Sequence, residues 1–413
     1  MKIWKDTYPI IISCSRGMVP QTSFELTEMG YAIVDSEDNM AVVRGNMRDI
    51  MRLNLHLRTA HRILVPLLRT ECHHLRDLYD AAYSIDWENF LDPDGYFMVN
   101  ARVTNDTIRD TRMPSLKTKD AIADRMRDYC GTRPDSGNET HGAAVYVYWQ
   151  DWELIIYLDT TGEPLSRRGY RKLPGAAPMQ ETLAAGCVLA SGWGGDTPFV
   201  VPMCGSGTPA IEAALIAINR APGNFKSHFG FMALKGYRIA IPGESAGTSV
   251  RKRFSASPEQ IWKEMVFNAR SKERRTGIPP IIATDISADA IEEAHMNAIA
   301  AGVAEHITFY ECDFRETKMP PAPGVVFLNP EYGERLGTDT DLEPLYSGIG
   351  DFFKQKCAGY TGCVFTGNME MSRKIGLRSS KRIPFYSGPL DCRLIVFDDL
   401  FAGSAEERRD IEG

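Results

Sequence analysis

The sequence predicts an α/β protein whose C-terminal half forms a doubly wound parallel sheet, preceded by a smaller α+β region. The first observation is that an apolar run, a glycine-bearing turn and a helical pattern follow one another within residues 199–214. The second is that three later apolar segments, 281–286, 309–313 and 325–332, each end in polar side chains. Strands that alternate with helices in this way are typical of a parallel sheet covered by helices on both faces.

The turn after the first of these strands is a candidate binding loop, Cys204-Gly205-Ser206-Gly207-Thr208. Gly205 and Gly207 can adopt positive φ and let a ligand approach bare backbone. A helix entered near Thr208 would point its unpaired N–H groups at the loop. We therefore expect a polar ligand here, although such turns also join strands to helices for steric reasons alone.

The polar strand endings Asp285, Asp313 and Asn329 are expected to converge, because the carboxyl ends of parallel strands line one crevice. A carboxylate such as that of Asp285 can accept two hydrogen bonds from a ribose diol. The dinucleotide fingerprint G-x-G-x-x-G is absent, since Pro209 and Ala210 follow the loop. A nicotinamide cofactor is therefore the weaker interpretation.

These motifs occur in the order found in class I S-adenosylmethionine (SAM)-dependent methyltransferases that modify exocyclic amines. More closely, the chain resembles the THUMP-containing RNA guanine-N2 methyltransferases, and among them the large-subunit (23S) ribosomal RNA enzymes. The resemblance covers nearly the whole chain and is carried by residues 165–171, 182–185, 204–208, 329–336, 365–368 and 388–393.

The resemblance implies a Rossmann-like class I methyltransferase domain behind a ferredoxin-like and a THUMP region. The expected bounds are 1–65 (ferredoxin-like), 66–160 (THUMP, RNA-binding), 161–180 (linker) and 181–402 (methyltransferase). SAM is the implied cofactor, with Asp285 on the ribose and Asp313 near the adenine amine. The cofactor-binding residues implied are Cys204, Gly205, Ser206, Gly207, Thr208, Asp285, Ile286, Asp313 and Phe314.

Asn329, Pro330 and Tyr332 are the expected catalytic residues, and their chemistry suits a planar exocyclic amine. The lone pair of guanine N2 is delocalised into the ring, so the nitrogen is a poor nucleophile. The Asn329 side-chain oxygen and the Pro330 carbonyl can each accept one N–H and aim the lone pair at a methyl donor. Tyr332 offers a face on which the displaced base can stack. As an alternative, Asn-Pro followed by glycine is an ordinary turn.

Two residues depart from the family pattern: Glu331 replaces a second proline, and Val201 replaces an aspartate. We expect Glu331 to accept N1–H and N2–H of guanine and so to favour guanine over adenine. The Val201 change removes a charge beneath the loop. Three alternatives stay open: a transfer RNA guanine, the N6 amine of adenine in DNA, or an RNA-binding assembly factor with weakened catalysis.

The RNA partner implied by the resemblance requires cationic contacts, yet the net charge of −7 argues against a uniformly basic surface. Lys117, Lys119 and Arg125 are the phosphate candidates in the THUMP-like region, and Arg168 and Arg171 those in the connector. Each can equally be a solubilising side chain. Further basic runs lie at 251–253, 272–275 and 381–382, the first two within a long insertion, 221–280, that could be a lid or substrate wall.

Composition bounds the remaining possibilities. With 413 residues, 43% hydrophobic and 24% charged, the chain is long enough for two or three globular domains. Nine cysteines without a C-x-x-C pair favour reduced thiols. The cluster Cys72-His73-His74 has no partner cluster at ligand spacing, so we expect no metal site. No apolar run long enough for a membrane helix and no signal peptide are evident, so we expect a cytoplasmic protein. The sequence leaves the oligomeric state open between a monomer and a weak dimer.

Overall fold

The computed structural model describes residues 2–105, 108, 110–171, 179–239, 256–331, 342–398 and 400. The chain forms two compact units. The N-terminal unit comprises Met1–Cys14, Thr22–Arg167 and Ala221–Ser271, and the C-terminal unit comprises Ser15–Gln21, Arg168–Arg220 and Lys272–Gly413. Each unit is built around one β-sheet.

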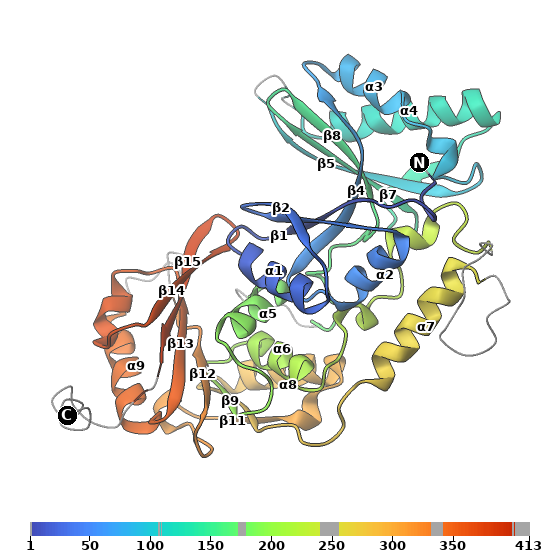
Figure 1. The fold of residues 1–413 in the computed structure, drawn as a ribbon. Helices are drawn as coiled ribbons and strands as arrows, with labels where there is room; N and C mark the ends of the chain where they lie inside the picture. The colour runs from blue at the N-terminus through green and yellow to red at the C-terminus, as the bar shows by residue number, and fades with distance from the viewer. Residues whose placement is uncertain are drawn as a thin grey trace. The chain divides into compact units, whose positions relative to one another are not determined.

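The sheet of the N-terminal unit has eight strands in the order β2-β3-β1-β4-β8-β7-β5-β6 (Figure 1). Its elements are β1 (Tyr8–Cys14), α1 (Val19–Glu28), β2 (Ile33–Glu37), β3 (Met40–Gly45), α2 (Met47–His56), β4 (Ala60–Glu71), α3 (Leu75–Tyr83), β5 (Tyr96–Thr104), α4 (Met113–Cys130), β6 (Asp135–Gly137), β7 (Ala143–Gln150), β8 (Glu153–Asp159) and α7 (Pro258–Ser271). Short 3-10 helices are η1 (Trp87–Asn89), η2 (Pro222–Phe225) and η3 (Gly230–Ala233).

Strand β4 joins the ferredoxin-like and THUMP-like regions into one sheet. On one side it pairs antiparallel with β1, and on the other it pairs antiparallel with β8, where Val65 lies opposite Leu158. The expected border between residues 65 and 66 therefore falls inside this strand. Local signals still set the helix ends: Asn46 and Asp49 form a reciprocal capping box at the start of α2, and Gly131 ends α4 at φ 74°.

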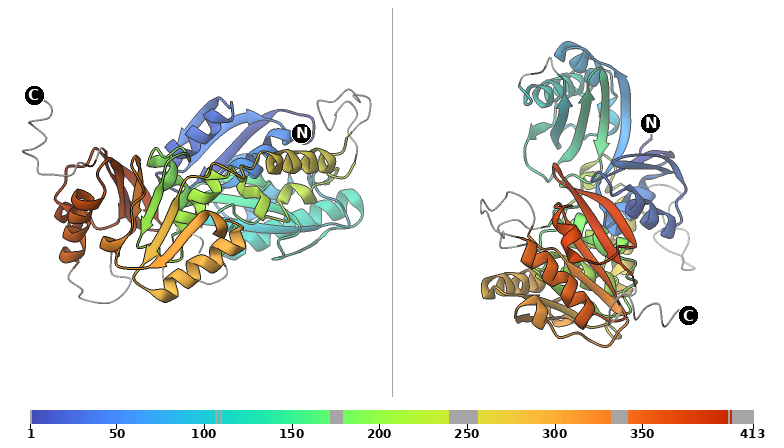
Figure 2. Two further views of the ribbon diagram at one scale, coloured as in Figure 1. Left: turned by 90° about the horizontal axis from the view of Figure 1, so that it is seen from below. Right: turned by 90° about the vertical axis from the view of Figure 1, so that its left-hand side faces the viewer.

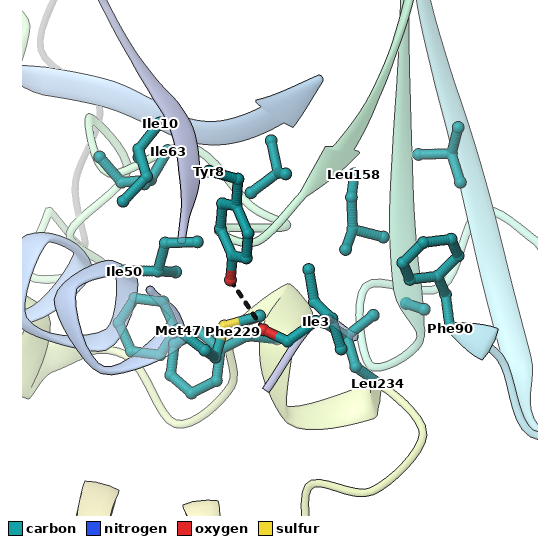
Figure 3. Packing of buried hydrophobic residues seen from close by; sticks show 14 of the residues in the cluster. Ile3, Tyr8, Ile10, Met47, Ile50, Ile63, Phe90, Leu158, Phe229 and Leu234 are labelled. Carbon is teal, nitrogen blue, oxygen red and sulfur yellow. Dashed lines mark hydrogen bonds between the residues drawn. The ribbon is translucent and has the colours of Figure 1, made fainter. Parts of the chain in front are cut away.

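The segment Ala221–Ser271 belongs to the N-terminal unit, although we expected it within the 181–402 domain. Phe229 and Leu234 lie among Tyr8, Met47 and other buried side chains of this unit (Figure 3). The ring of Trp262 on α7 meets those of Phe229 and Phe231 edge-on, at centroid distances of 5.2 and 5.1 Å. The described part of the insertion thus completes a hydrophobic core, because packing there removes the apolar area of its aromatic side chains from water.

The sheet of the C-terminal unit has seven strands in the order β11-β10-β9-β12-β13-β15-β14. Its elements are α5 (Glu181–Ala190), β9 (Phe199–Pro202), α6 (Thr208–Ala217), β10 (Ile281–Asp285), α8 (Ala288–Ala301), η4 (Ala304–His306), β11 (Ile307–Glu311), η5 (Phe314–Glu316), β12 (Gly324–Leu328), α9 (Glu343–Lys356), β13 (Tyr360–Thr366), η7 (Met371–Ile375), β14 (Lys381–Ser387) and β15 (Leu390–Phe397). The right-hand view of Figure 2 shows α9 beside the strands of the β13–β15 region.

Strand direction and order place the crevice of the C-terminal unit. The pairs β11–β10, β10–β9, β9–β12 and β12–β13 are parallel, whereas β15 runs antiparallel to both β13 and β14. The chain leaves β9 toward β10 and β11 on one side and returns to β12 and β13 on the other. The order therefore reverses between β9 and β12, and in such sheets ligands bind beyond the carboxyl ends of the strands at this switch point.

Candidate active site

The loop between β9 and α6 lies at the switch point and has an unusual backbone. Met203, Gly205 and Gly207 all have positive φ, of 59°, 51° and 80°. A Cβ added to Gly205 would meet nothing within 4 Å, so its backbone borders open space. At Gly207 an added Cβ would lie 2.8 Å from the Cβ of Ala294 on α8. One glycine thus leaves room for a ligand, and the other lets a helix pack closely.

Asp285, the last residue of β10, holds this loop. Its Oδ2 accepts a hydrogen bond of 2.9 Å from the N–H of Gly205, and its Oδ1 accepts one of 3.1 Å from the N–H of Ser287. Each carboxylate oxygen keeps a further lone pair for a ligand donor. The next residue, Ile286, is 71% exposed and offers an apolar surface beside the carboxylate.

Asp313 and Phe314 follow β11, the strand next to β10. Asp313 accepts from the N–H of Arg315 at 2.8 Å and pairs with the guanidinium of the same residue at 3.2 Å. Phe314 is buried, and its ring meets Phe352 edge-on at 5.7 Å. Its side chain is therefore a core residue, so any contact of Phe314 with a cofactor falls to its backbone.

The chain leaves β12 through Asn329, Pro330 and Glu331. The Oδ1 of Asn329 is buried and has no hydrogen-bond partner among the described residues. Pro330 is buried, whereas the side chain of Glu331 is exposed. Since β12 pairs directly with β9, the parallel register brings Asn329 to the same edge as the glycine loop. Tyr332, the third expected catalytic residue, lies outside the described residues.

Cys204 and Ser206 of the loop and Val201 of the preceding strand make structural contacts. Burial, followed by the negative charge of Asp285, raises the pKa of the Cys204 thiol, so this cysteine stays protonated and is no nucleophile. The carbonyl of Ser206 accepts from the Asn297 amide on α8 at 3.2 Å. Val201 is fully buried in β9, and its side chain is part of the core.

Asn297 was not among the expected site residues, although the sequence carries a signal for it. It is buried, and its helix α8 buries a stripe that includes Ala294, Ala298 and Ala301. An amide on such an apolar stripe is costly unless it has a partner, and here it finds the loop carbonyl. Tyr346, whose hydroxyl contacts the carbonyl of Glu331, and Thr366, which bonds to that hydroxyl, were also missed, because nothing in their local sequence indicates these contacts.

Two of the expected phosphate contacts are corrected by the structure. Arg168 is buried and forms a bidentate pair with the buried carboxylate of Glu212 on α6, at 2.7 and 3.1 Å. Arg125 is 8% exposed and donates to Asp86 and Glu88. Neither guanidinium is presented to solvent, because each forms an ion pair within its own unit. Their partners are 44 and 37–39 residues away in sequence, so no local pattern shows them.

The other expected contacts remain accessible to different degrees. Lys117 has a 40% exposed side chain, 3.5 Å from Asp120. The ammonium of Lys119 donates to the carbonyl of Gly137 at 3.0 Å. Arg171 donates to the carbonyl of Met179 at 2.7 Å and lies 3.4 Å from Glu181.

A more concentrated basic segment lies in the C-terminal unit, around the predicted run 381–382. Five exposed cationic residues occur within ten positions: Arg373, Lys374, Arg378, Lys381 and Arg382. We call this the η7–β14 basic segment. Of the other predicted runs, 251–253 lies outside the described residues, and Arg274 donates to the carbonyls of Gly195 and Gly277.

The predictions that the chain holds no metal site and no membrane segment concern absences and stay predictions. Within the described ranges, no three His, Cys, Asp or Glu side chains are grouped as metal ligands. Cys72 is buried with its thiol 3.5 Å from the carbonyl of His74, and the ring of His73 is tilted by 42° against that of Trp152, at a centroid distance of 4.8 Å. In the same part of the chain, no helix has the length and apolar character needed to cross a bilayer.

Three protein-family models match consecutive parts of the chain. They are the RlmL ferredoxin-like domain over residues 9–64, the THUMP domain over residues 72–159, and the RMKL-like methyltransferase domain over residues 168–395. The last model covers more than half of the chain and contains the switch-point loop and the residues after β12.

Curated relatives agree with these matches. A putative RNA methyltransferase of Synechocystis sp. is 31% identical, over 95% of this chain and 97% of that protein. The ribosomal RNA large subunit methyltransferase K/L of Psychromonas ingrahamii is 34% identical over 93% of this chain and 49% of that protein, and that of Methylococcus capsulatus 32% over 95% and 51%. The chain thus spans about half the length of the K/L relatives.

Solved structures of similar fold include SMU.472, a putative methyltransferase complexed with SAH, at a TM-score of 0.82 and 25% identity, covering 97% of this chain and 100% of that one. A possible methylase from Clostridium difficile 630 gives 0.81 and 26%, with 97% and 100% covered. A predicted N6-adenine-specific DNA methylase from Listeria monocytogenes gives 0.78 and 27%, with 95% and 96% covered.

Proposed function

Because the chain belongs to the RMKL-like methyltransferase family and carries its ferredoxin-like and THUMP domains, we propose that it methylates the N2 amine of a guanine in large-subunit ribosomal RNA, with SAM as the methyl donor. The family and the α/β fold class predicted from the sequence are both confirmed. The observation that carries the choice of chemistry is the buried Oδ1 of Asn329 at the switch point, which has no hydrogen-bond partner among the described residues.

The residues at the crevice fit SAM. Gly205 exposes backbone to open space, as a loop that cradles a ligand must, and Asp285 keeps acceptor capacity for a ribose diol. The exposed Ile286 is placed for the face of an adenine ring. When bound, SAM supplies an electrophilic methyl group on a sulfonium. A solved relative in complex with SAH supports this assignment.

Asn329 and Pro330 carry the proposed chemistry on the acceptor. A buried acceptor without a partner costs about 1–3 kcal/mol, and this cost is relieved when a ligand N–H donates to it. The Oδ1 of Asn329 and the carbonyl of Pro330 each accept one hydrogen of the guanine amine. The amine becomes pyramidal, its lone pair points away from the ring, and one of its protons passes to solvent after transfer.

The RNA substrate follows from the THUMP domain and from the names of the relatives, which are RNA and large-subunit ribosomal RNA methyltransferases. One similar structure is named as a DNA adenine methylase, and Asn-Pro chemistry serves that amine as well. Glu331, exposed beside Asn329, favours guanine because its carboxylate can accept N1–H and N2–H together. We place the enzyme in the cytoplasm, as a monomer or weak dimer.

The test is methyl transfer from labelled SAM to protein-free ribosomal RNA, transfer RNA and duplex DNA, followed by nucleoside analysis. We expect N2-methylguanosine from ribosomal RNA, and an Asn329→Ala enzyme that binds SAM normally but transfers at least 100-fold more slowly. Label in transfer RNA would assign transfer RNA as the substrate instead, and N6-methyladenine in DNA would assign adenine in place of guanine as the target base. RNA and SAM binding without label in any pool would favour an assembly factor.

A further inference from the structure

The hydroxyl of Tyr346 contacts the segment that follows Asn329 and Pro330. Tyr346 lies on α9 and is fully buried in the core cluster between this helix and β12–β13. Its hydroxyl lies 3.3 Å from the carbonyl oxygen of Glu331 and 2.6 Å from the Oγ1 of Thr366, the last residue of β13. That Oγ1 also accepts from the backbone N–H of Asn368 at 3.0 Å.

Only one set of hydrogen positions satisfies all three contacts. The Glu331 carbonyl can only accept, so the single hydrogen of Tyr346 points to it. The Tyr346 oxygen then accepts from Thr366, whose own oxygen accepts from the amide of Asn368. The result is a head-to-tail chain in which each bond polarises the next. Burial raises the pKa of Tyr346 to about 12, so the donor keeps its hydrogen at neutral pH.

We propose that this hydrogen-bond chain, which runs from Asn368 through Thr366 and Tyr346 to Glu331, positions the methyl-acceptor site, with Tyr346 as the positioning residue. The proposal rests on the function proposed above and names a further determinant of it. Pro330, whose carbonyl receives the amine, stands between the end of β12 and the tethered carbonyl of Glu331. The proline ring fixes φ of Pro330, and the hydrogen bond from Tyr346 restrains the backbone rotations between Pro330 and the Glu331 carbonyl.

A displacement of about 1 Å at a reacting group can cost about 100-fold in rate, so a tether of this kind affects turnover more than binding. Loss of the Tyr346 hydroxyl frees the Glu331 carbonyl and lets the Pro330 carbonyl turn away from the amine. The proposed cofactor contacts at Gly205 and Asp285 lie in the loop after β9 and at the end of β10, so they are untouched. The signature is therefore a lower kcat at unchanged affinity for SAM.

Tyr360 provides a matched control in the same unit. It is also buried, burial also raises its pKa to about 12, and its hydroxyl also donates to a backbone carbonyl, that of Pro320, at 2.7 Å. Pro320 precedes β12 and lies nine residues before Asn329 in sequence. A Tyr360→Phe enzyme thus loses a comparable internal hydrogen bond that does not touch the acceptor segment.

The experiment compares Tyr346→Phe, Thr366→Val, Thr366→Ser and Tyr360→Phe with the wild type in single-turnover methyl transfer, SAM binding and thermal unfolding. We expect Tyr346→Phe and Thr366→Val each to lower the transfer rate about 10- to 100-fold, with the SAM Kd within about twofold of wild type. The double variant should be no slower than the slower single variant. Thr366→Ser should restore the rate, and Tyr360→Phe should transfer normally at a similar melting temperature.

Amide hydrogen exchange supplies a readout that needs no activity. Tyr346→Phe and Thr366→Val should speed exchange in peptides that contain residues 329–331 and 366–369, and Tyr360→Phe should not. Equal transfer rates for Tyr346→Phe and Tyr360→Phe would overturn the proposal, as would unchanged exchange. If the wild type transfers no methyl group while exchange is altered in the variants, the proposed function is refuted. The hydrogen-bond chain would then only stabilise the local structure.

Discussion

The carboxylate of Asp285 accepts a hydrogen bond from the backbone N–H of Gly205 across 2.9 Å, which ties the end of β10 to the loop between β9 and α6. The two residues are eighty positions apart, and the parallel pairing of β9 with β10 brings them together. One side chain thus shapes the glycine loop and keeps lone pairs for a ligand.

Replacement of Asp285 by Asn should weaken SAM binding about 10- to 100-fold, in line with the about 1.5–3 kcal/mol of a hydrogen bond to a charged group. The amide can still accept from one backbone N–H, but its NH2 opposes the other, so the loop loosens as well. Calorimetric titration with SAM measures the effect. Asp289→Asn, an exposed change in the first turn of α8, is the control. Equal affinities of the two variants would contradict the ribose assignment.

Gly207→Ala should destabilise the C-terminal unit more than Gly192→Ala. Both glycines have φ near 80°, which costs a residue with a Cβ about 1–2 kcal/mol, but at Gly192 the added Cβ meets nothing. At Gly207 it would also lie 2.8 Å from the Cβ of Ala294, and overpacking adds about 1–3 kcal/mol. Urea unfolding of the two variants measures the difference. Ala294→Gly in the Gly207→Ala background should recover part of the loss.

Arg168→Met should lower the stability of the C-terminal unit by about 3–5 kcal/mol, because it leaves the buried Glu212 carboxylate without its cation. The hydroxyl of Tyr170 also donates to Glu212, at 2.8 Å, but cannot neutralise it. Chemical denaturation should show most of the stability regained in Arg168→Met/Glu212→Leu. At temperatures where Arg168→Met stays folded, its RNA affinity should equal that of the wild type, and a selective loss of RNA binding would reinstate Arg168 as a phosphate contact.

The N-terminal unit should lose stability in acid through Glu88. Hydrogen bonds from the Arg125 guanidinium hold the pKa of Glu88 below its usual value. A carboxyl whose pKa is lower in the folded state stabilises that state above the unfolded pKa, and the contribution is lost as pH falls through the folded value. The urea midpoint of this unit, measured from pH 7 to pH 3, should therefore fall less steeply in acid for Glu88→Gln. Glu153→Gln, at an exposed pair, should retain the wild-type slope.

The η7–β14 basic segment should contribute to the salt dependence of RNA binding. Replacing both Lys381 and Arg382 by Gln should make the negative slope of log K against log salt shallower. The change is about 0.7–0.9 for each RNA phosphate that the variant no longer neutralises. Lys263→Gln/Arg270→Gln removes the same charge from exposed positions on α7 and serves as the control. Identical slopes for the two double variants would show that the segment is only a solvated surface.

Local signals were sufficient for much of the candidate site. The glycine loop, Asp285 and Asn329 lie where alternating strands and helices place them, because parallel strands direct their carboxyl ends to a single edge. Charge alone was a poor guide: Arg125 and Arg168 are cations by sequence and buried ion-pair members by structure.

The amino-acid sequence by itself determined the fold class, the family and the residues that meet at the switch point. Periodicity and turn chemistry act over a few residues, so they can be followed along the chain. The tertiary structure alone decided that β4 unites two regions in one sheet, that the described part of Ala221–Ser271 completes the N-terminal core, and that Tyr346 reaches the carbonyl of Glu331. Those contacts join residues distant in sequence, where burial and hydrogen-bond satisfaction select the partner and no local pattern encodes it.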